Sequence, residues 1–239
     1  MKFDADLVVI GAGSAGLSVA AGAVQMAARV VLIEGGEMGG DCLNTGCVPS
    51  KALIEAARRA KGAASAKNLG VSYKDVTVDY ASVMRHVRET IAAIEPHDSQ
   101  ERFEGLGVRV IRGYAEFASK NSVRVGDETL TARRIVVAAG ATPIAPPING
   151  LDAVAYFTNE TFFENYDRPD HLIIIGGGPI GVEMAQAHAQ LGIETTLIER
   201  FEILPREISE TREIVRTKLL QDGVTVFENC DVSSIKENT

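Results

Sequence analysis

The sequence contains no tryptophan, only three cysteines and four histidines among 239 residues, and it is poor in basic residues. It has 24 Lys and Arg against 32 Asp and Glu, which gives a net charge of -8. Nucleic acids and anionic membranes are recognised by clustered basic side chains. The composition therefore predicts a partner that is neither a nucleic acid nor a membrane surface, and its 46% apolar content suffices for packed cores.

The longest mostly apolar run, residues 7–33, has the length of a membrane span. Glycines, Gln25 and Arg29 interrupt it, and Asp4 and Asp6 precede it where a signal peptide carries positive charge. The run therefore predicts a buried strand and a packed helix. Few cysteines and no signal sequence predict a cytoplasmic protein, in which a close cysteine pair is more often catalytic or metal-binding than structural.

Residues 6–34 and 171–199 form an internal repeat that aligns without a gap at an offset of 165. Each copy has an apolar β-branched run, the pattern G-x-G-x-x-G, a helical stretch, a second apolar run and a glutamate. One such glycine pattern is weak evidence, but two copies with flanking strands are typical of dinucleotide-binding units. The sequence predicts an α/β fold with two Rossmann-like dinucleotide-binding domains.

Each glycine of the repeat has a predicted role. The first allows a tight turn, the second lets the backbone approach a pyrophosphate, and the third lets the helix pack on its strand, with the helix N-terminus facing the phosphates. The candidate cofactor-binding residues are Gly11, Gly13, Ser14, Ala15 and Gly16 in the first copy and Gly176, Gly178, Pro179, Ile180 and Gly181 in the second.

Two glutamates end the repeat. Glu34 and Glu199 each follow the first glycine of their copy by 23 residues, where a carboxylate accepts hydrogen bonds from a ribose diol. The apolar runs Leu7–Ile10 and Leu172–Ile175 are short and β-branched, which predicts fully buried parallel strands.

The segment between the copies predicts helices and an added sheet. Residues 79–94 have helical periodicity behind Asp79 as the N-cap. Residues 108–118 and 122–143 alternate as strands do, with a turn at Gly126 and Asp127. The proline-rich stretch 142–151 predicts the crossing between two domains, 1–148 and 149–239.

Cys42 and Cys47 are separated by four residues. Structural zinc needs four ligands, usually with about two residues between paired cysteines. Cys230 is distant and the four histidines form no ligand pair, so the sequence predicts no metal site. In a regular helix the Cα atoms of residues i and i+5 are about 8.6 Å apart. A disulfide tolerates at most about 7 Å, so a bridge here requires a distorted turn.

Gly46 and Pro49 suit such a turn, because glycine is flexible and proline fits the first turn of the helix that "SKALIEAARRA" predicts. The positive end of that helix would stabilise a thiolate. The pattern favours a redox centre over a zinc site.

The motif resembles that of the pyridine nucleotide–disulfide oxidoreductases, the flavoprotein family that includes dihydrolipoamide dehydrogenase, glutathione reductase and mercuric reductase. The family pattern GG-x-C-x₄-C-x-P-S-K is matched by Gly39, Gly40, Cys42, Cys47, Pro49, Ser50 and Lys51. It lies between an FAD-binding and an NAD(P)-binding glycine motif, as here. The resemblance covers essentially the whole chain and implies that Cys42 and Cys47 form a redox-active disulfide beside a flavin.

The resemblance also implies catalytic roles. Cys47 would face the flavin, and Cys42 would attack the disulfide substrate. Lys51 would lie near the flavin ring and pair with Glu183, although both could be ordinary surface charges of helices.

Further residues are assigned to FAD by resemblance. Gly40 and Asp41 would lie near its pyrophosphate, the backbone of Ala115 would contact the adenine, and Ala139 and Gly140 would pass near the cofactor. Cys230 matches no family motif.

Three positions depart from the family pattern: Asp41 and Ala139 each replace a threonine, and Pro179 replaces the tyrosine of glutathione reductases. Glu199 and Gly181 favour NAD over NADP, because a carboxylate repels the 2′-phosphate. Arg200 follows Glu199 directly and could soften this preference.

The chain resembles the N-terminal half of such proteins. The resemblance implies an FAD-binding domain over 1–148 and an incomplete NAD(P)-binding domain over 149–239, without the C-terminal dimerisation domain. The full-length protein would be a homodimer, and this chain alone would have little activity, because the acid/base histidine belongs to that last domain.

The leading hypothesis is an FAD- and NAD-dependent disulfide oxidoreductase, most like dihydrolipoamide dehydrogenase, that acts on a small dithiol or disulfide or on a lipoyl protein. A mercuric reductase is the alternative within the family. An inactive two-nucleotide-binding fragment and a flavin reductase without a disulfide substrate are alternatives of other classes.

Overall fold

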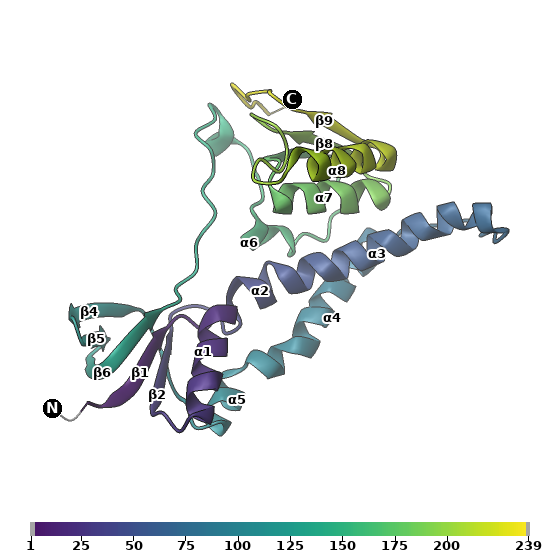
Figure 1. Cartoon of the computed structure of the whole chain (residues 1–239). Coiled ribbons are helices and arrows are strands. Elements are labelled where there is room, and N and C mark those ends of the chain that lie inside the picture. The colour runs from purple at the N-terminus through teal and green to yellow at the C-terminus, as the bar shows by residue number, and fades with distance from the viewer. Residues whose placement is uncertain (1–2, 238–239) are drawn as a thin grey trace. The chain divides into compact units, whose positions relative to one another are not determined.

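The computed structural model describes residues 3–237, apart from the side chains of residues 64, 65, 67 and 68. The chain forms two compact units (Figure 1). The first contains the residues up to Pro49 together with Glu89–Pro143, and the second contains Ser50–Arg88 and the residues from Ile144 on. The predicted boundary between nucleotide-binding domains at residue 148 stays a prediction.

The first unit contains a six-stranded sheet in the order β3-β2-β1-β6-β5-β4. Strands β1, β2, β3 and β6 are parallel neighbours, whereas β4, β5 and β6 pair antiparallel. The predicted turn at Gly126 and Asp127 is confirmed between β5 and β6. The strands are β1 (Ala5–Ile10), β2 (Val30–Glu34), β3 (Arg109–Arg112), β4 (Ala115–Ser119), β5 (Ser122–Val125) and β6 (Glu128–Val137).

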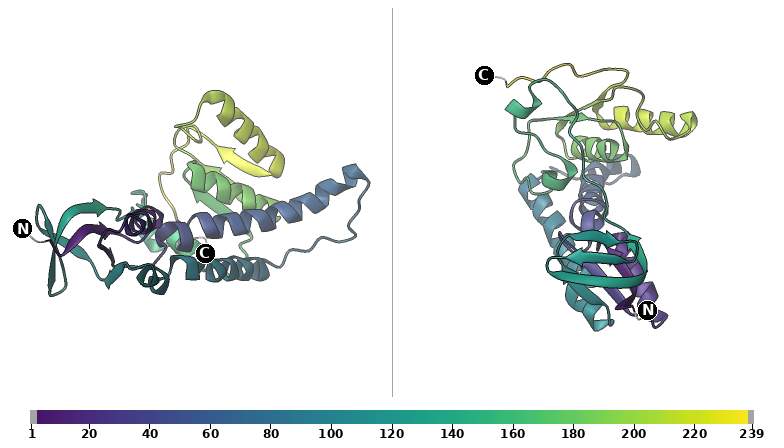
Figure 2. Two further views of the ribbon diagram at one scale, coloured as in Figure 1. Left: turned by 60° about the horizontal axis from the view of Figure 1, so that its bottom comes forward. Right: turned by 90° about the vertical axis from the view of Figure 1, so that its left-hand side faces the viewer.

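The second unit contains a parallel sheet in the order β7-β8-β9. Helix α7 connects β7 to β8, and α8 connects β8 to β9. The two helices pack against the sheet and against each other (Figure 2). The elements are β7 (His171–Ile175), α7 (Pro179–Gln190), β8 (Glu194–Ile198), α8 (Ser209–Asp222) and β9 (Val224–Phe227).

The remaining helices are α1 (Ser14–Gln25), α2 (Gly40–Asn44), α3 (Cys47–Ser65), α4 (Tyr80–Asp98), α5 (Gln100–Gly105) and α6 (Asn159–Phe162), with 3₁₀ segments η1 (Ala66–Leu69) and η2 (Leu151–Ala153). The helix predicted over 79–94 is confirmed as α4, which extends further, to Asp98, and the helix predicted from residue 50 is confirmed within α3; α2, α5 and α6 were not predicted. Asp79 caps the predicted helix as expected, because its carboxylate accepts a hydrogen bond from the backbone N–H of Ser82 at 3.1 Å.

The predicted strand and helix within residues 7–33 are confirmed as β1 and α1, followed by β2. Strand β1 lies inside the sheet, and Val8 and Val9 are fully buried on its opposite faces. Across the residues that the structure describes, no helix is both long enough and apolar enough to cross a membrane.

The prediction that both first strands of the repeat are fully buried is wrong for β7. Ile173 and Ile175 remain 57% and 40% exposed. Strand β7 lies at the edge of its sheet, and α7 and α8 cover the face that contains Ile174. The apolar run therefore predicted a strand correctly. Its second face stays exposed because no element among the described residues packs against it.

Candidate functional site

The first glycine motif forms a tight turn from β1 into α1. Gly11 has a φ of +104°, and a Cβ at this position would lie 2.2 Å from the carbonyl oxygen of Ala138. A Cβ on Gly16 would lie 1.8 Å from the carbonyl oxygen of Gly11. Both positions require glycine, the first for its backbone conformation and the second for close packing of helix on strand.

The second glycine motif repeats this geometry between β7 and α7. Gly176 has a φ of +115°, and a Cβ on Gly181 would lie 1.9 Å from the carbonyl oxygen of Gly176. One difference is chemical, because α7 begins at Pro179, which has no N–H, whereas α1 begins at Ser14. The second helix therefore offers one backbone donor fewer to an anion.

Glu34 and Glu199 bind the glycine loops in the same way. The carboxylate of Glu34 accepts the N–H groups of Ala12 at 2.5 Å and Gly36 at 2.6 Å. That of Glu199 accepts those of Gly177 at 2.6 Å and Phe201 at 2.9 Å. These bonds hold each carboxylate at the carboxyl end of its sheet, and each keeps acceptor capacity for a ribose diol.

A second backbone segment approaches the first glycine loop. The N–H of Gly39 donates to the carbonyl of Ala12 at 2.9 Å, and Gly13 and Gly39 form a parallel bridge. A Cβ on Gly40 would lie 2.7 Å from the Cα of Gly13. The start of α1, which has no acidic residue in its first turn, is thus flanked by glycine backbone. This cradle fits a pyrophosphate.

The loop after β6 lies beside the same turn. The N–H of Ala138 donates to the carbonyl of Ile10 at 2.7 Å, and the Cβ position of Gly11 is 3.0 Å from the backbone nitrogen of Ala139. Gly140 follows with a φ of +71°. The structure therefore brings Ala139 next to the first glycine loop. A cofactor bound at that loop could contact both segments.

The predicted distortion between the cysteines is confirmed. Cys42 lies half-buried in α2, the chain leaves helical geometry at Thr45, and Cys47 begins α3 in an exposed position. The N–H of Thr45 donates to the carbonyl of Asp41 at 2.9 Å. A Cβ on Gly46 would lie 3.6 Å from the Cα of Cys42, so the turn brings the residue before Cys47 directly against Cys42.

Sequence reasoning missed a polar group within this turn. The hydroxyl oxygen of Thr45 is buried and has no hydrogen-bond partner among the described residues. A buried hydroxyl without a partner is costly, so Thr45 is a point of local instability in the turn. The position of Thr45 between the two cysteines was the available signal.

Sequence reasoning also missed an aromatic residue near Glu34. The N–H of Gly113 donates to the carbonyl of Glu34 at 2.8 Å. The ring of Tyr114 lies against Gly35, where a Cβ would be 2.6 Å from two ring carbons, and its side chain is 81% exposed. Ala115 follows as the first residue of β4. The predicted adenine contact at Ala115 thus lies next to an exposed aromatic ring.

The remaining predicted site residues lie on exposed positions. Lys51 is exposed on α3, and Glu183 is exposed on α7. Asp41 is exposed in the first turn of α2, and Pro179 and Ile180 are exposed at the start of α7. The pairing of Lys51 with Glu183 and the cofactor contacts of the others stay predictions.

A groove of about 910 Å³ runs along α8, away from the glycine motifs in sequence. It contains none of the residues that the sequence assigned to a site. Its lining is Glu202, Ser209, Glu210, Arg212, Glu213, Ile214, Arg216, Thr217, Lys218 and Gln221. Because this groove includes no residue of the predicted motifs, we place the candidate sites at the first glycine loop with the cysteine turn and, separately, at the second glycine loop.

The chain is similar in sequence to curated mercuric reductases and dihydrolipoyl dehydrogenases only over part of their length, as two examples show. The chain is 33% identical over 238 residues to mercuric reductase from Bacillus cereus, covering 99% of this chain and 38% of that protein. It is 36% identical over 228 residues to dihydrolipoyl dehydrogenase 3 from Haloarcula marismortui, covering 92% and 47% of the two. The chain thus spans about half or less of the length of these curated relatives.

A solved structure has the same fold. It is the Cu(II) complex of the HOCl-induced flavoprotein disulfide reductase RclA from Escherichia coli, with a TM-score of 0.82 and 28% identity over 98% of this chain and 51% of that one. The family model described as pyridine nucleotide-disulphide oxidoreductase matches residues 5–239. Because that match extends over nearly the whole sequence, the predicted family and its Rossmann-like α/β fold are confirmed, and the chain belongs to the pyridine nucleotide-disulphide oxidoreductases.

Proposed function

We propose that the protein transfers two electrons between NADH and a disulfide, with FAD and the pair Cys42–Cys47 as carriers. In the balanced reaction, NADH, one proton and a disulfide yield NAD⁺ and two thiols, and the reverse direction oxidises a dithiol. Bound FAD would supply the chemistry that links hydride transfer to thiol–disulfide exchange. The substrate would be a small dithiol or disulfide, or a lipoyl group on a partner protein, as in dihydrolipoamide dehydrogenase.

The first unit is suited to hold FAD. The cradle of Gly13, Gly39 and Gly40 offers backbone to the pyrophosphate, with the donors of Ser14 and Ala15 at the start of α1. Glu34 would accept the adenosine ribose hydroxyls.

The cysteine turn is the observation that carries the proposal. A Cβ on Gly46 would lie 2.8 Å from the carbonyl oxygen of Asp41 and 3.6 Å from the Cα of Cys42, so the chain folds back on Cys42 just before Cys47. The turn therefore allows an approach of the two thiols that a regular helix forbids. Cys47, at the start of α3, would be the thiol facing the flavin, and Cys42 the one that attacks the substrate.

Lys51 and Glu183 would assist at the flavin, with Lys51 near the ring and Glu183 as its ion-pair partner. Their exposed positions on α3 and α7 leave both side chains available for this role. The second glycine loop and Glu199 would hold NAD, because their hydrogen bonds match those of the first loop and Glu34. NADP is disfavoured because Glu199 repels a 2′-phosphate.

The absorption spectrum of the FAD-loaded protein tests these roles. Reduction by two electrons is expected to produce a long-wavelength band from a thiolate beside oxidised flavin. Cys47→Ser is expected to abolish the band, whereas Cys42→Ser is expected to show it without reduction. Identical spectra for the two variants would contradict the separate roles. Cys230→Ser is the matched control and is expected to behave as the unmodified protein.

Mercuric reductase activity is the second candidate, since relatives of that name share 30–33% identity with the chain. Steady-state oxidation of NADH by the full protein, with lipoamide in one assay and Hg(II) with excess thiol in the other, separates the two. Lipoamide turnover at least tenfold faster than Hg(II) turnover is expected. The reverse order would assign the protein to mercury reduction.

A further inference from the structure

Arg200 is the cation placed closest in sequence to the proposed ribose acceptor Glu199. Its guanidinium carbon lies 5.7 Å from the ring centroid of Phe201, and its side chain is 68% exposed. In nucleotide-binding units of this kind, an arginine near the acidic position is the group that accommodates a 2′-phosphate. Arg200 would therefore favour NADP if its charge were available.

The charge of Arg200 already has a partner. Its Nε lies 3.6 Å from Oδ2 of Asp231, which is beyond the end of β9. A surface ion pair of this kind is weak, but it opposes any other anion that competes for the same guanidinium.

Backbone hydrogen bonds hold the segment that contains Asp231. The N–H of Cys230 donates to the carbonyl of Glu199 at 3.0 Å, and the N–H of Asn229 donates to the carbonyl of Phe201 at 2.9 Å. Asn229 adopts a left-handed φ of +53°, a conformation that asparagine tolerates better than most residues. Segment 228–231 is thus bonded to both residues that flank Arg200.

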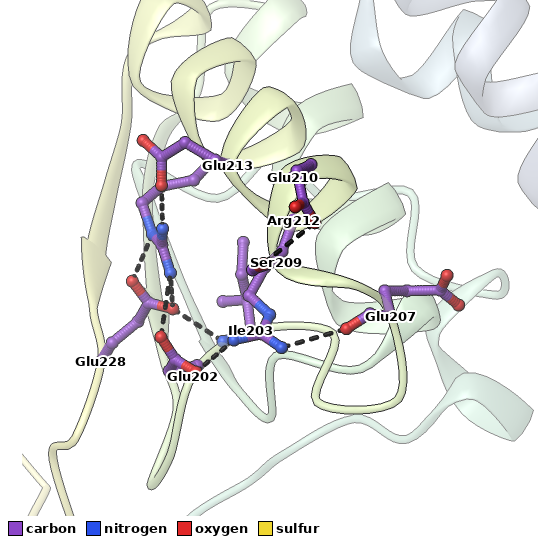
Figure 3. Close-up of polar contacts among 9 residues, drawn as sticks. Glu202, Ile203, Glu207, Ser209, Glu210, Arg212, Glu213 and Glu228 are labelled. Atoms are coloured by element: carbon purple, nitrogen blue, oxygen red, sulfur yellow. Dashed lines mark hydrogen bonds and ion pairs between the residues drawn. The ribbon is translucent and has the colours of Figure 1, made fainter.

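A side-chain network fixes the start of the same segment (Figure 3). Glu228 accepts the backbone N–H of Ile203 at 2.7 Å and Nε of Arg216 at 2.6 Å. The hydrogen bonds from Arg216 are the main cause of the lowered pKa of Glu228, so its carboxylate stays ionised at neutral pH. The segment is therefore tied to α8 and to the loop after β8 before it reaches Asp231.

We propose that Asp231 is a specificity-determining residue that disfavours NADP by pairing with Arg200. The proposal rests on the proposed function, because it requires a nicotinamide dinucleotide with its adenosine ribose at Glu199. A 2′-phosphate would meet the carboxylates of Glu199 and Asp231 and an arginine whose charge is compensated. The 2′-hydroxyl of NAD carries no charge and needs only an acceptor, which Glu199 provides.

Binding of NADH and NADPH to the FAD-loaded full protein tests the proposal, with the flavin and the cysteine pair fully reduced beforehand so that no hydride is transferred. Dissociation constants would be measured by nucleotide fluorescence for the unmodified protein, Asp231→Asn, and Asp231→Asn combined with Arg200→Gln. Asp167→Asn removes one exposed carboxylate from the same unit and serves as the control for net charge. Thermal unfolding of each variant reports whether the fold is kept.

The unmodified protein is expected to bind NADH more tightly than NADPH. Asp231→Asn is expected to tighten NADPH binding about 3- to 10-fold and to leave the Kd of NADH within about twofold, as for one partly exposed charge contact. The gain is expected to vanish in the double variant and to be absent in Asp167→Asn. Unchanged NADPH binding in Asp231→Asn, or a gain that persists without Arg200, would overturn the role of Asp231. Failure of the unmodified protein to bind either nucleotide would overturn the proposed function as well.

Discussion

The hydroxyl of Tyr80 lies 3.2 Å from Nε2 of His188, and both side chains are buried within the second unit. Nδ1 of His188 is 2.7 Å from the carbonyl oxygen of Met184, which can only accept, so Nδ1 carries the proton. Nε2 of the neutral ring is then the acceptor for the hydroxyl of Tyr80. The ring of Phe162 packs edge-on against His188, with centroids 5.1 Å apart.

This environment predicts a loss of stability in mild acid. Burial lowers the pKa of His188, although its bond to Met184 opposes the shift, and burial raises the pKa of Tyr80 to about 12. Below pH 6.5 the unfolded chain therefore binds a proton that the folded chain excludes, and the free energy of unfolding falls by at most about 1.4 kcal/mol per pH unit. The loss ends once the pH falls below the lowered pKa of His188.

Urea unfolding between pH 5 and 7.5 measures this dependence, with His188→Gln as the variant that cannot titrate. The variant is expected to lose the slope over this range even if its stability is lower throughout. Buried or paired carboxylates such as Asp222 and Glu228 have lowered pKa values. Their protonation therefore lowers the free energy of unfolding only in stronger acid. An unchanged slope in His188→Gln would assign the effect to another group.

Thr45→Val is expected to stabilise the chain without bound flavin. The hydroxyl oxygen of Thr45 is buried without a partner among the described residues, and valine replaces it by a methyl group of similar size. Removing one unsatisfied buried hydroxyl should raise the free energy of unfolding by about 1–2 kcal/mol. Denaturant unfolding of the FAD-free protein measures this, and Thr45→Ser, which keeps the hydroxyl, should show no gain.

The glycines of α1 offer a matched pair of substitutions. A Cβ on Gly16 would lie 1.8 Å from the carbonyl oxygen of Gly11, whereas one on Gly22 meets nothing within 4 Å. Gly16→Ala is therefore expected to displace α1 and to weaken FAD binding at least tenfold. Gly22→Ala should instead stabilise the helix by about 0.5–1 kcal/mol. Flavin fluorescence and thermal unfolding measure the two effects, and equal results for both variants would contradict the packing role of Gly16.

Asp222 is expected to be the costliest polar side chain to truncate in the second unit. Its carboxylate is fully buried and accepts hydrogen bonds from Gln186 at 2.9 Å, Gln190 at 2.6 Å and Lys218 at 3.0 Å. Asp222→Ala would leave these donors without their shared acceptor and should lower the free energy of unfolding by about 3 kcal/mol. Lys218→Gln, which removes one half-exposed donor, should cost less than about 1 kcal/mol in the same chemical unfolding assay.

The local pattern of the sequence was sufficient for several features because each depends on residues close along the chain. The turns at Gly11 and Gly176, the Asp79 cap and the turn at Gly126 all follow from backbone conformation and short-range hydrogen bonds. The separation of 23 residues also placed Glu34 and Glu199 correctly at the ends of β2 and β8. The repeat predicted two related glycine loops, and the structure has the same carboxylate-to-backbone hydrogen bond at both.

The burial of strands β1 and β7 and the pairing of charged side chains depend on contacts between residues that are distant in sequence. The runs at Leu7–Ile10 and Leu172–Ile175 have the same apolar pattern, yet β1 is enclosed on both faces and β7 is not, because only β1 has a strand on each side and cover on both faces. The ion pair of Arg200 with Asp231 and the unpartnered hydroxyl of Thr45 likewise depend on how loops meet. Desolvation and charge pairing act through space, so the order of residues alone could not predict them.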